Sequence, residues 1–433
     1  MRAIWIRTAL LNFLIAALMG AVMRFAFVQE IPWLSYKAFL HGHSHGALLG
    51  WLYLMLFSLF IGLFLEKPQR SRAVYHYLFW ATQVSVVGMF VSFPLQGYGP
   101  VSIFFSTVHI LLSYAFGFVF WKDIKGQTSL AARLARRAIF WMGFSTLGVW
   151  ALGPIMTSAL RGSSWYYLAI QFFLHFQFHG WLVFGVLALF FRWLENQALL
   201  PSRPYPAAFL PVLSWATLLT YALAVAWSNP HPLVFALNST GILLQLYALW
   251  MLRAMVRPLL IAIRQRVRRD AFWLWQTSLL AFIAKVGIQG MVILPFVARM
   301  AYTIRNYVIG FVHLLMLGVL SLFFFALLTQ ETRIFARNGA HRVGLALFLI
   351  GLLLSEGLLF LQGTLFWAKL GFLPHYYPAL FSASICMPAG LLVMWAAGLL
   401  QSTDISNTPS PTEAMDLAER PVRGPDSAGH EVS

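Results

Sequence analysis

The sequence alternates long apolar runs with short polar connectors over nearly its whole length. A helix that crosses the roughly 30 Å hydrocarbon core of a bilayer needs about 20 mainly apolar residues. Such a run must be helical or part of a closed barrel, because lipid offers no partner to an exposed backbone group. The pattern predicts an all-α fold, a polytopic membrane bundle of about twelve transmembrane helices within residues 1–401. The runs lie at 3–28, 39–65, 74–97, 99–121, 134–158, 165–191, 205–227, 232–253, 271–295, 305–329, 343–361 and 377–400.

The two ends of the chain differ in character. Residues 1–28 have the charge pattern of a signal peptide but no clear small-residue cleavage site, so we expect them to remain as the first helix. Residues 402–433 are rich in Ser, Pro, Thr, Glu and Asp, a composition that cannot bury a core. The sequence therefore predicts a transmembrane domain followed by a disordered cytoplasmic tail.

Composition and charge support a membrane protein and exclude other classes. Hydrophobic residues make up 60% of the 433 residues and charged residues 10%, a ratio that a soluble globule does not show. If the N-terminus is cytoplasmic, most of the 30 Lys and Arg residues fall on the inner side, so the net charge of +17 reflects the positive-inside rule and not nucleic-acid binding. We expect a multi-pass protein of the bacterial inner membrane with both termini cytoplasmic. Cys386 is the single cysteine and lies in an apolar run, which excludes a disulfide framework.

Deeply placed histidines occur only in even-numbered runs, and four of them lie at one depth. In this topology they follow 8 to 10 residues after the outer ends of these helices, counted from Lys37, Pro100, Trp165 and Arg305, which is roughly 12–15 Å along the helix. A single buried histidine is usually a hydrogen-bonded core residue, but imidazoles from four helices at one depth indicate a metal or haem site. A proton relay and a transporter site remain as alternatives. The four histidines are His45, His109, His175 and His313, and His179 follows one turn after His175.

One motif resembles a known family. The stretch NYVIGFVHLLMLG, residues 306–318, is similar to the tenth helix of subunit I in the haem-copper oxidase and nitric oxide reductase superfamily. The resemblance implies that His313 is an axial ligand of a low-spin haem b, and it places Phe311 where the family has the ligand of its active-site haem. The second low-spin ligand is expected near the outer end of the second helix. We predict His45 for it, with His41 on the same face as the reserve and His43 pointing roughly opposite.

The sixth run extends the resemblance and also shows its limits. The stretch HFQFHGWLVF, residues 175–184, is similar to helix 6 of nitric oxide reductases, with His175 at the non-haem metal ligand and His179 where that family has a glutamate. The paired histidines of helix 7 are absent from residues 205–227, which argues against a conventional binuclear centre. His109, His175 and His179 could still hold a second haem or a copper or iron ion. The alternative is that they pack and hydrogen-bond within the bundle.

Further charged residues fall within or beside the runs. Lys285 and Glu356 share a depth roughly 21–22 Å from the cytoplasmic ends of their helices. Either they form a mutual ion pair or they serve a proton path towards the outer half. Arg299 and Arg305 are candidates to neutralise haem propionates, or act as interfacial anchors.

Two functions are compatible with these residues. The first is a haem-containing membrane oxidoreductase that acts on a small gas, oxygen or nitric oxide, or on quinol, as part of a respiratory electron-transport chain. Cytochrome c or quinol would then be the electron donor, and a partner subunit is possible on the same grounds. The second is a non-enzymatic carrier or a metal- or haem-handling protein on the same scaffold.

Overall fold

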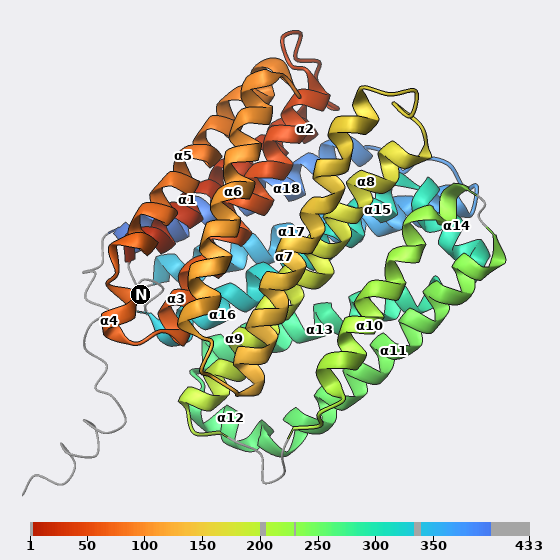
Figure 1. Ribbon diagram of the computed structural model, residues 1–433. Coiled ribbons are helices and arrows are strands. Elements are labelled where there is room, and N and C mark those ends of the chain that lie inside the picture. The colour runs from red at the N-terminus through yellow and green to blue at the C-terminus, as the bar shows by residue number, and fades with distance from the viewer. Residues whose placement is uncertain (1–2, 200–204, 229–230, 333–338, 400–433) are drawn as a thin grey trace, which may run out of the picture.

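The computed structural model describes residues 3–199, 205–228, 231–332 and 339–399, and within them every regular element is a helix (Figure 1). Eleven helical stretches in these ranges are long and apolar enough to cross a membrane. The predicted all-α polytopic bundle is therefore confirmed, while the predicted tail at 402–433 lies outside the described residues. The stretches are Ala3–Phe25 (α1), Tyr36–Phe64, Ala73–Gln96 (α5), Pro100–Asp123 (α6), Leu130–Met156 (α7), Ser164–Asn196, Pro232–Arg266, Arg269–Met291 (α13), Arg305–Glu331, Gly339–Trp367 (α17) and Tyr376–Leu399 (α18).

The predicted seventh run is the one that differs from a full membrane span. It forms α10 (Phe209–Leu219) and then tightens into the 3-10 segment η3 (Thr220–Ser228), so its apolar helix is shorter than the others. The tightening occurs where η3 meets α11 (Pro232–Val256) very closely. A Cβ atom on Gly241 of α11 would lie 2.8 Å from the backbone nitrogen of Thr220, so this approach requires glycine.

The second, sixth and tenth spans share one architecture. Each is a helix that changes to a π-helical segment directly after a histidine and then returns to an α-helix. π-Helical turns inside α-helices are rare and occur frequently at functional sites. The three spans are thus alike in structure although no sequence repeat relates them. They consist of α2 (Tyr36–His45), η1 (Gly46–Tyr53) and α3 (Leu54–Phe64); α8 (Ser164–His175), η2 (Phe176–Leu182) and α9 (Val183–Asn196); and α15 (Arg305–His313), η5 (Leu314–Ser321) and α16 (Leu322–Glu331).

The two halves of these three spans are packed differently. Nearly all side chains of α3, α9 and α16 are buried, and they form the middle of the main hydrophobic core. The Nε1 of Trp51 in η1 donates to the Oγ of Ser321 in η5 at 2.8 Å, and Trp51 stacks on Phe13 of α1 with ring centroids 4.6 Å apart. This core therefore fixes the second and tenth spans against each other below the histidines.

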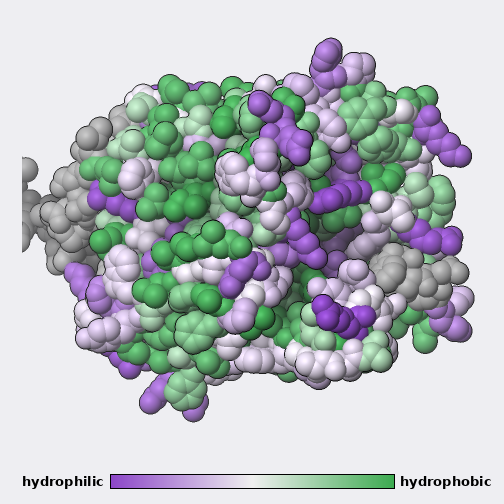
Figure 2. Space-filling view, turned by 90° about the horizontal axis from the view of Figure 1, so that it is seen from above, coloured by the Kyte–Doolittle hydropathy of each residue, from purple (hydrophilic) through white to green (hydrophobic). Residues whose placement is uncertain are grey.

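The upper end of the bundle is less densely filled. Most side chains of α2, α8 and α15 are only partly buried, although these helices continue the most deeply buried spans. Seen from above, this end has hydrophilic side chains in its middle, around a hollow between hydrophobic ones (Figure 2). The helices α4 (Lys67–Arg70) and α12 (Leu260–Arg266) lie at the opposite, lower end (Figure 1). His45, His175 and His313 thus lie where these spans change from partly buried to fully buried side chains.

Candidate functional site

The predicted site histidines lie at equivalent points of the fold. His45, His175 and His313 are the last residues of α2, α8 and α15, each directly before the π-helical segment of its span. His109 lies within α6 and is 2% exposed. The structure separates these histidines into three clusters, which differ in charge and in hydrogen bonding.

The first cluster, called the His313 cluster, contains His313, Glu356 of α17, His43 of α2 and Arg24 of α1. The Nδ1 of His313 lies 3.8 Å from Oε1 of Glu356, and the His313 side chain stays 27% exposed. The Nδ1 of His43 hydrogen-bonds to the backbone carbonyl of Ala16 at 2.7 Å. Both His43 and Arg24 lie close enough to His313 to act on its charge. Four separate helices therefore meet at this cluster.

Cationic and aromatic groups border the His313 cluster. Arg24 interacts electrostatically with Glu356, Tyr376 and Arg305. The guanidinium of Arg305 lies over the ring of Tyr36, 5.8 Å from its centroid. The cluster and its border thus contain two arginines and one carboxyl group. This balance suits a ligand that carries negative charge. The predicted Arg305 lies within electrostatic reach of Arg24, a residue that the sequence did not single out as a site residue.

The second cluster, called the His45 cluster, lies on the other face of α2. The Nδ1 of His45 hydrogen-bonds to the carbonyl of His41 at 2.9 Å, and its Nε2 lies 3.4 Å from the hydroxyl of Tyr98. The His45 ring packs on Phe93 of α5 at 4.3 Å between centroids. His109 of α6 lies within electrostatic reach of His45, and its Nε2 is buried with no hydrogen-bond partner. These contacts direct His45 towards α5 and α6.

Among the described residues, the predicted haem ligands His45 and His313 share no contact, since His45 packs on Phe93 and His313 lies beside Glu356. His43 and His45 point away from each other, as their spacing predicts, and His43 is within electrostatic reach of His313. His41 stays with His45, its ring 4.5 Å from that of Tyr98. The spacing of the three histidines fixes which share a face, whereas the direction of each face depends on how α2 packs.

The third cluster, called the Lys285 cluster, contains His175, His179 and Lys285 of α13. The rings of His175 and His179 lie 4.8 Å apart, as expected from their i, i+4 spacing. The Nε2 of His175 donates to the backbone carbonyl of Thr217 at 2.8 Å, whereas the Nδ1 of His179 is buried without a partner. The ring of Phe311 lies 6.3 Å from that of His179. Phe311, which occupies the position of the family's active-site haem ligand, is thus an apolar side chain beside this cluster.

The predicted ion pair is absent from the described residues, while a metal chelate by His175 and His179 stays a prediction. In the part of the chain that the structure describes, no group of three His, Cys, Asp or Glu side chains is arranged to hold a metal ion. Lys285 and Glu356 do not form an ion pair there, because Glu356 lies beside His313 and Lys285 beside His179. The two charged residues therefore belong to separate sites. A proton path through either of them stays a prediction.

Comparison with known proteins does not assign a function to these clusters. No protein-family model matches the sequence, and the search of characterised proteins found no significant relative. The functional interpretation consequently rests on the chemistry of the three clusters.

Proposed function

We propose that this protein is a haem-binding redox protein of the membrane, of the type seen in subunit I of haem-copper oxidases and nitric oxide reductases, with a low-spin haem and without a conventional binuclear centre. We assign the axial ligands to His313 and, in place of His45, to His43. A bound haem would supply one-electron chemistry by cycling between ferric and ferrous iron.

The observation that carries this proposal is that an oxygen atom lies beside the Nδ1 of each of the two imidazoles. A ligating histidine usually engages its other ring nitrogen with a carbonyl or carboxylate, which fixes the ring and its tautomer. The Nδ1 of His43 meets the Ala16 carbonyl, and the Nδ1 of His313 lies beside Glu356. Among the described residues, the polar contacts of both rings are made through Nδ1. This leaves the two Nε2 atoms to act as ligands.

The charged groups around the two histidines are compatible with the propionates of a haem. Arg24 and Arg305 can pair with propionates, since arginine binds carboxylates through charge-assisted hydrogen bonds. Glu356 can hold His313 in one orientation and raise its basicity as a ligand. Most side chains of the helices that carry the two histidines are only partly buried, whereas nearly all side chains of the lower halves of these spans are buried.

The test is spectroscopy of the detergent-purified protein in its oxidised and dithionite-reduced forms, with haem type and content measured on the same sample. We expect a reducible spectrum of a six-coordinate low-spin haem b. His313→Leu and His43→Leu should each abolish this spectrum. His45→Leu is the matched control, since it removes an imidazole from the same helix but from the opposite face, and it should leave the spectrum intact.

Two results would contradict the proposal. A colourless preparation of well-folded protein would exclude the haem. A haem that survives His43→Leu but not His45→Leu would show that the ligand on the second span is His45, and the assignment from this geometry would be wrong.

A further inference from the structure

Lys285 is a buried amine without a carboxylate partner. It is 3% exposed and lies within a membrane-spanning helix, closer to its C-terminal end. The ion pairs in the described part of the chain are Arg72–Asp123, Arg192–Glu195, His313–Glu356 and Arg342–Asp270, and Lys285 belongs to none of them. A lone ammonium group in a dry interior is costly, so its charge needs a counterion.

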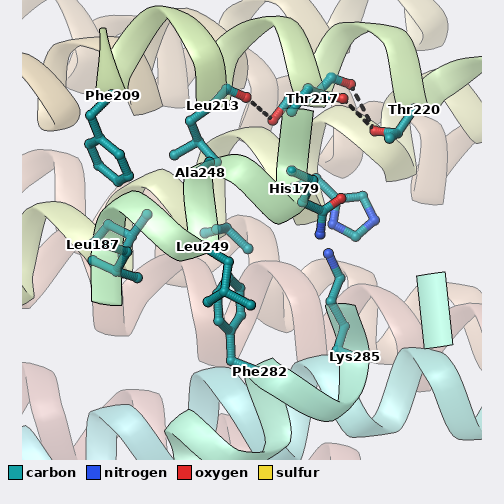
Figure 3. A pocket seen from close by; sticks show the side chains of 14 residues that line it. His179, Leu187, Phe209, Leu213, Thr217, Thr220, Ala248, Leu249, Phe282 and Lys285 are labelled. Atoms are coloured by element: carbon teal, nitrogen blue, oxygen red, sulfur yellow. Dashed lines mark hydrogen bonds between the residues drawn. The ribbon is translucent and has the colours of Figure 1, made fainter. Parts of the chain in front are cut away.

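A cavity lies directly at this amine. It is enclosed by α9, η2, α10, η3, α11 and α13, and His179 and Lys285 line its polar end (Figure 3). The side-chain nitrogen of Lys285 points toward the ring of His179 in this view. Apolar side chains such as Leu187, Leu213 and Phe282 line the rest. The cavity volume is about 30 Å³, which is room for one or two water-sized groups.

The polar end of the cavity offers hydrogen-bond donors but no acidic side chain. His179 has a buried Nδ1 without a partner, and Lys285 carries up to three N–H groups. The nearby His175 already donates a hydrogen bond to the Thr217 carbonyl. The amide nitrogen of Gln245 donates to the side-chain oxygen of Gln289 at 2.7 Å. The unpartnered Nδ1 of His179 and the amine of Lys285 therefore line the same small space.

We propose that this cavity is a binding site for a small inorganic monoanion, such as chloride or nitrite, held between Lys285 and His179. One ammonium group balances one negative charge, and the small volume suits a halide or a three-atom anion better than phosphate or sulfate. A divalent metal ion is disfavoured at the same place, because the ammonium group would repel it. The site does not depend on the proposed haem, which belongs to the His313 cluster.

The experiment measures anion binding to the full chain in detergent, with gluconate as the background anion because it is too large for the cavity. Chloride, bromide and nitrite are each titrated while the melting temperature is recorded, and radiolabelled chloride is used for equilibrium dialysis. We expect a saturable rise in melting temperature and about one chloride bound per chain. The same binding should persist in His313→Leu, so failure of the haem proposal leaves this test unaffected.

Three variants make the assignment specific. Lys285→Met should weaken chloride binding by at least roughly tenfold, because it removes the only fixed positive charge at the cavity. His179→Leu should weaken it less and serves as the test if Lys285→Met does not fold. Lys122→Met removes an exposed lysine near the end of α6 and should change nothing. The proposal fails if the wild-type protein binds none of the three anions, which would mean that Lys285 is a neutral amine, or if Lys285→Met and His179→Leu bind as tightly as Lys122→Met.

Discussion

The close packing of α17 against α18 leads to a sharp prediction about stability. A Cβ atom on Gly344 of α17 would lie 2.7 Å from the backbone oxygen of Gly390 and 3.1 Å from the backbone nitrogen of Met394, both on α18. These are main-chain atoms, so they cannot swing aside. Small residues at such positions let transmembrane helices approach closely, and this approach is the main source of packing energy between them in lipid. Gly344→Ala must therefore push the two helices apart.

The expected cost follows from the size of the overlap. Separating two packed helices to admit one methyl group costs about 1–3 kcal/mol in comparable overpacked sites. Gly357→Ala on the same helix is the control, because a Cβ atom there meets nothing within 4 Å. Replacing glycine by alanine in an unobstructed helix stabilises by up to about 1 kcal/mol. The two substitutions are chemically identical and should change the free energy of unfolding in opposite directions.

Reversible unfolding of the purified protein in mixed micelles, driven by increasing SDS and followed by circular dichroism, measures both variants against the wild type. Gly344→Ala should unfold at a lower SDS fraction and Gly357→Ala at an equal or higher one. If Gly344→Ala proves as stable as Gly357→Ala, the backbones of α17 and α18 are not in the close contact described here.

Two further predictions concern the core and the His313 cluster. Ser321→Ala leaves the buried Nε1 of Trp51 without an acceptor and should lower the free energy of unfolding by about 1–3 kcal/mol, whereas Ser58→Ala, which loses only a bond to its own helix, should cost clearly less in the same SDS titration. If the haem proposal holds, Glu356→Gln removes the ionisable carboxyl group beside His313 and, at a pH at which this group is ionised, should raise the haem midpoint potential on the order of 50 mV, about 1 kcal/mol for one electron. A redox titration that shows no shift or a lower potential would contradict this role of Glu356.

The sequence predicted the architecture well but the partners of single residues poorly. The apolar runs located the spans, because lipid imposes a length and a helical backbone on any segment that crosses it. The seventh run is the exception, since its 3-10 segment depends on the approach of Gly241 to Thr220. No local pattern in residues 205–227 reports that contact.

The site shows the same division between local and tertiary information. The spacing of His41, His43 and His45 correctly placed His43 on the opposite face, but it could not say which face meets His313. The equal depth of Lys285 and Glu356 suggested a pair, yet depth leaves the rotation of each helix about its axis undetermined. In the packed bundle, Glu356 lies beside His313 and Lys285 lies beside His179.

By itself, the sequence determined that this chain is a bundle of apolar helices with imidazoles at matched depths, because hydrophobic length and helical rise are properties of each segment alone. The tertiary structure decided that these imidazoles separate into three clusters with different charge, because the facing of a helix is set by all of its neighbours. It also revealed the π-helical segment after each central histidine, which follows from the packing of the whole bundle and leaves no mark in the local sequence pattern.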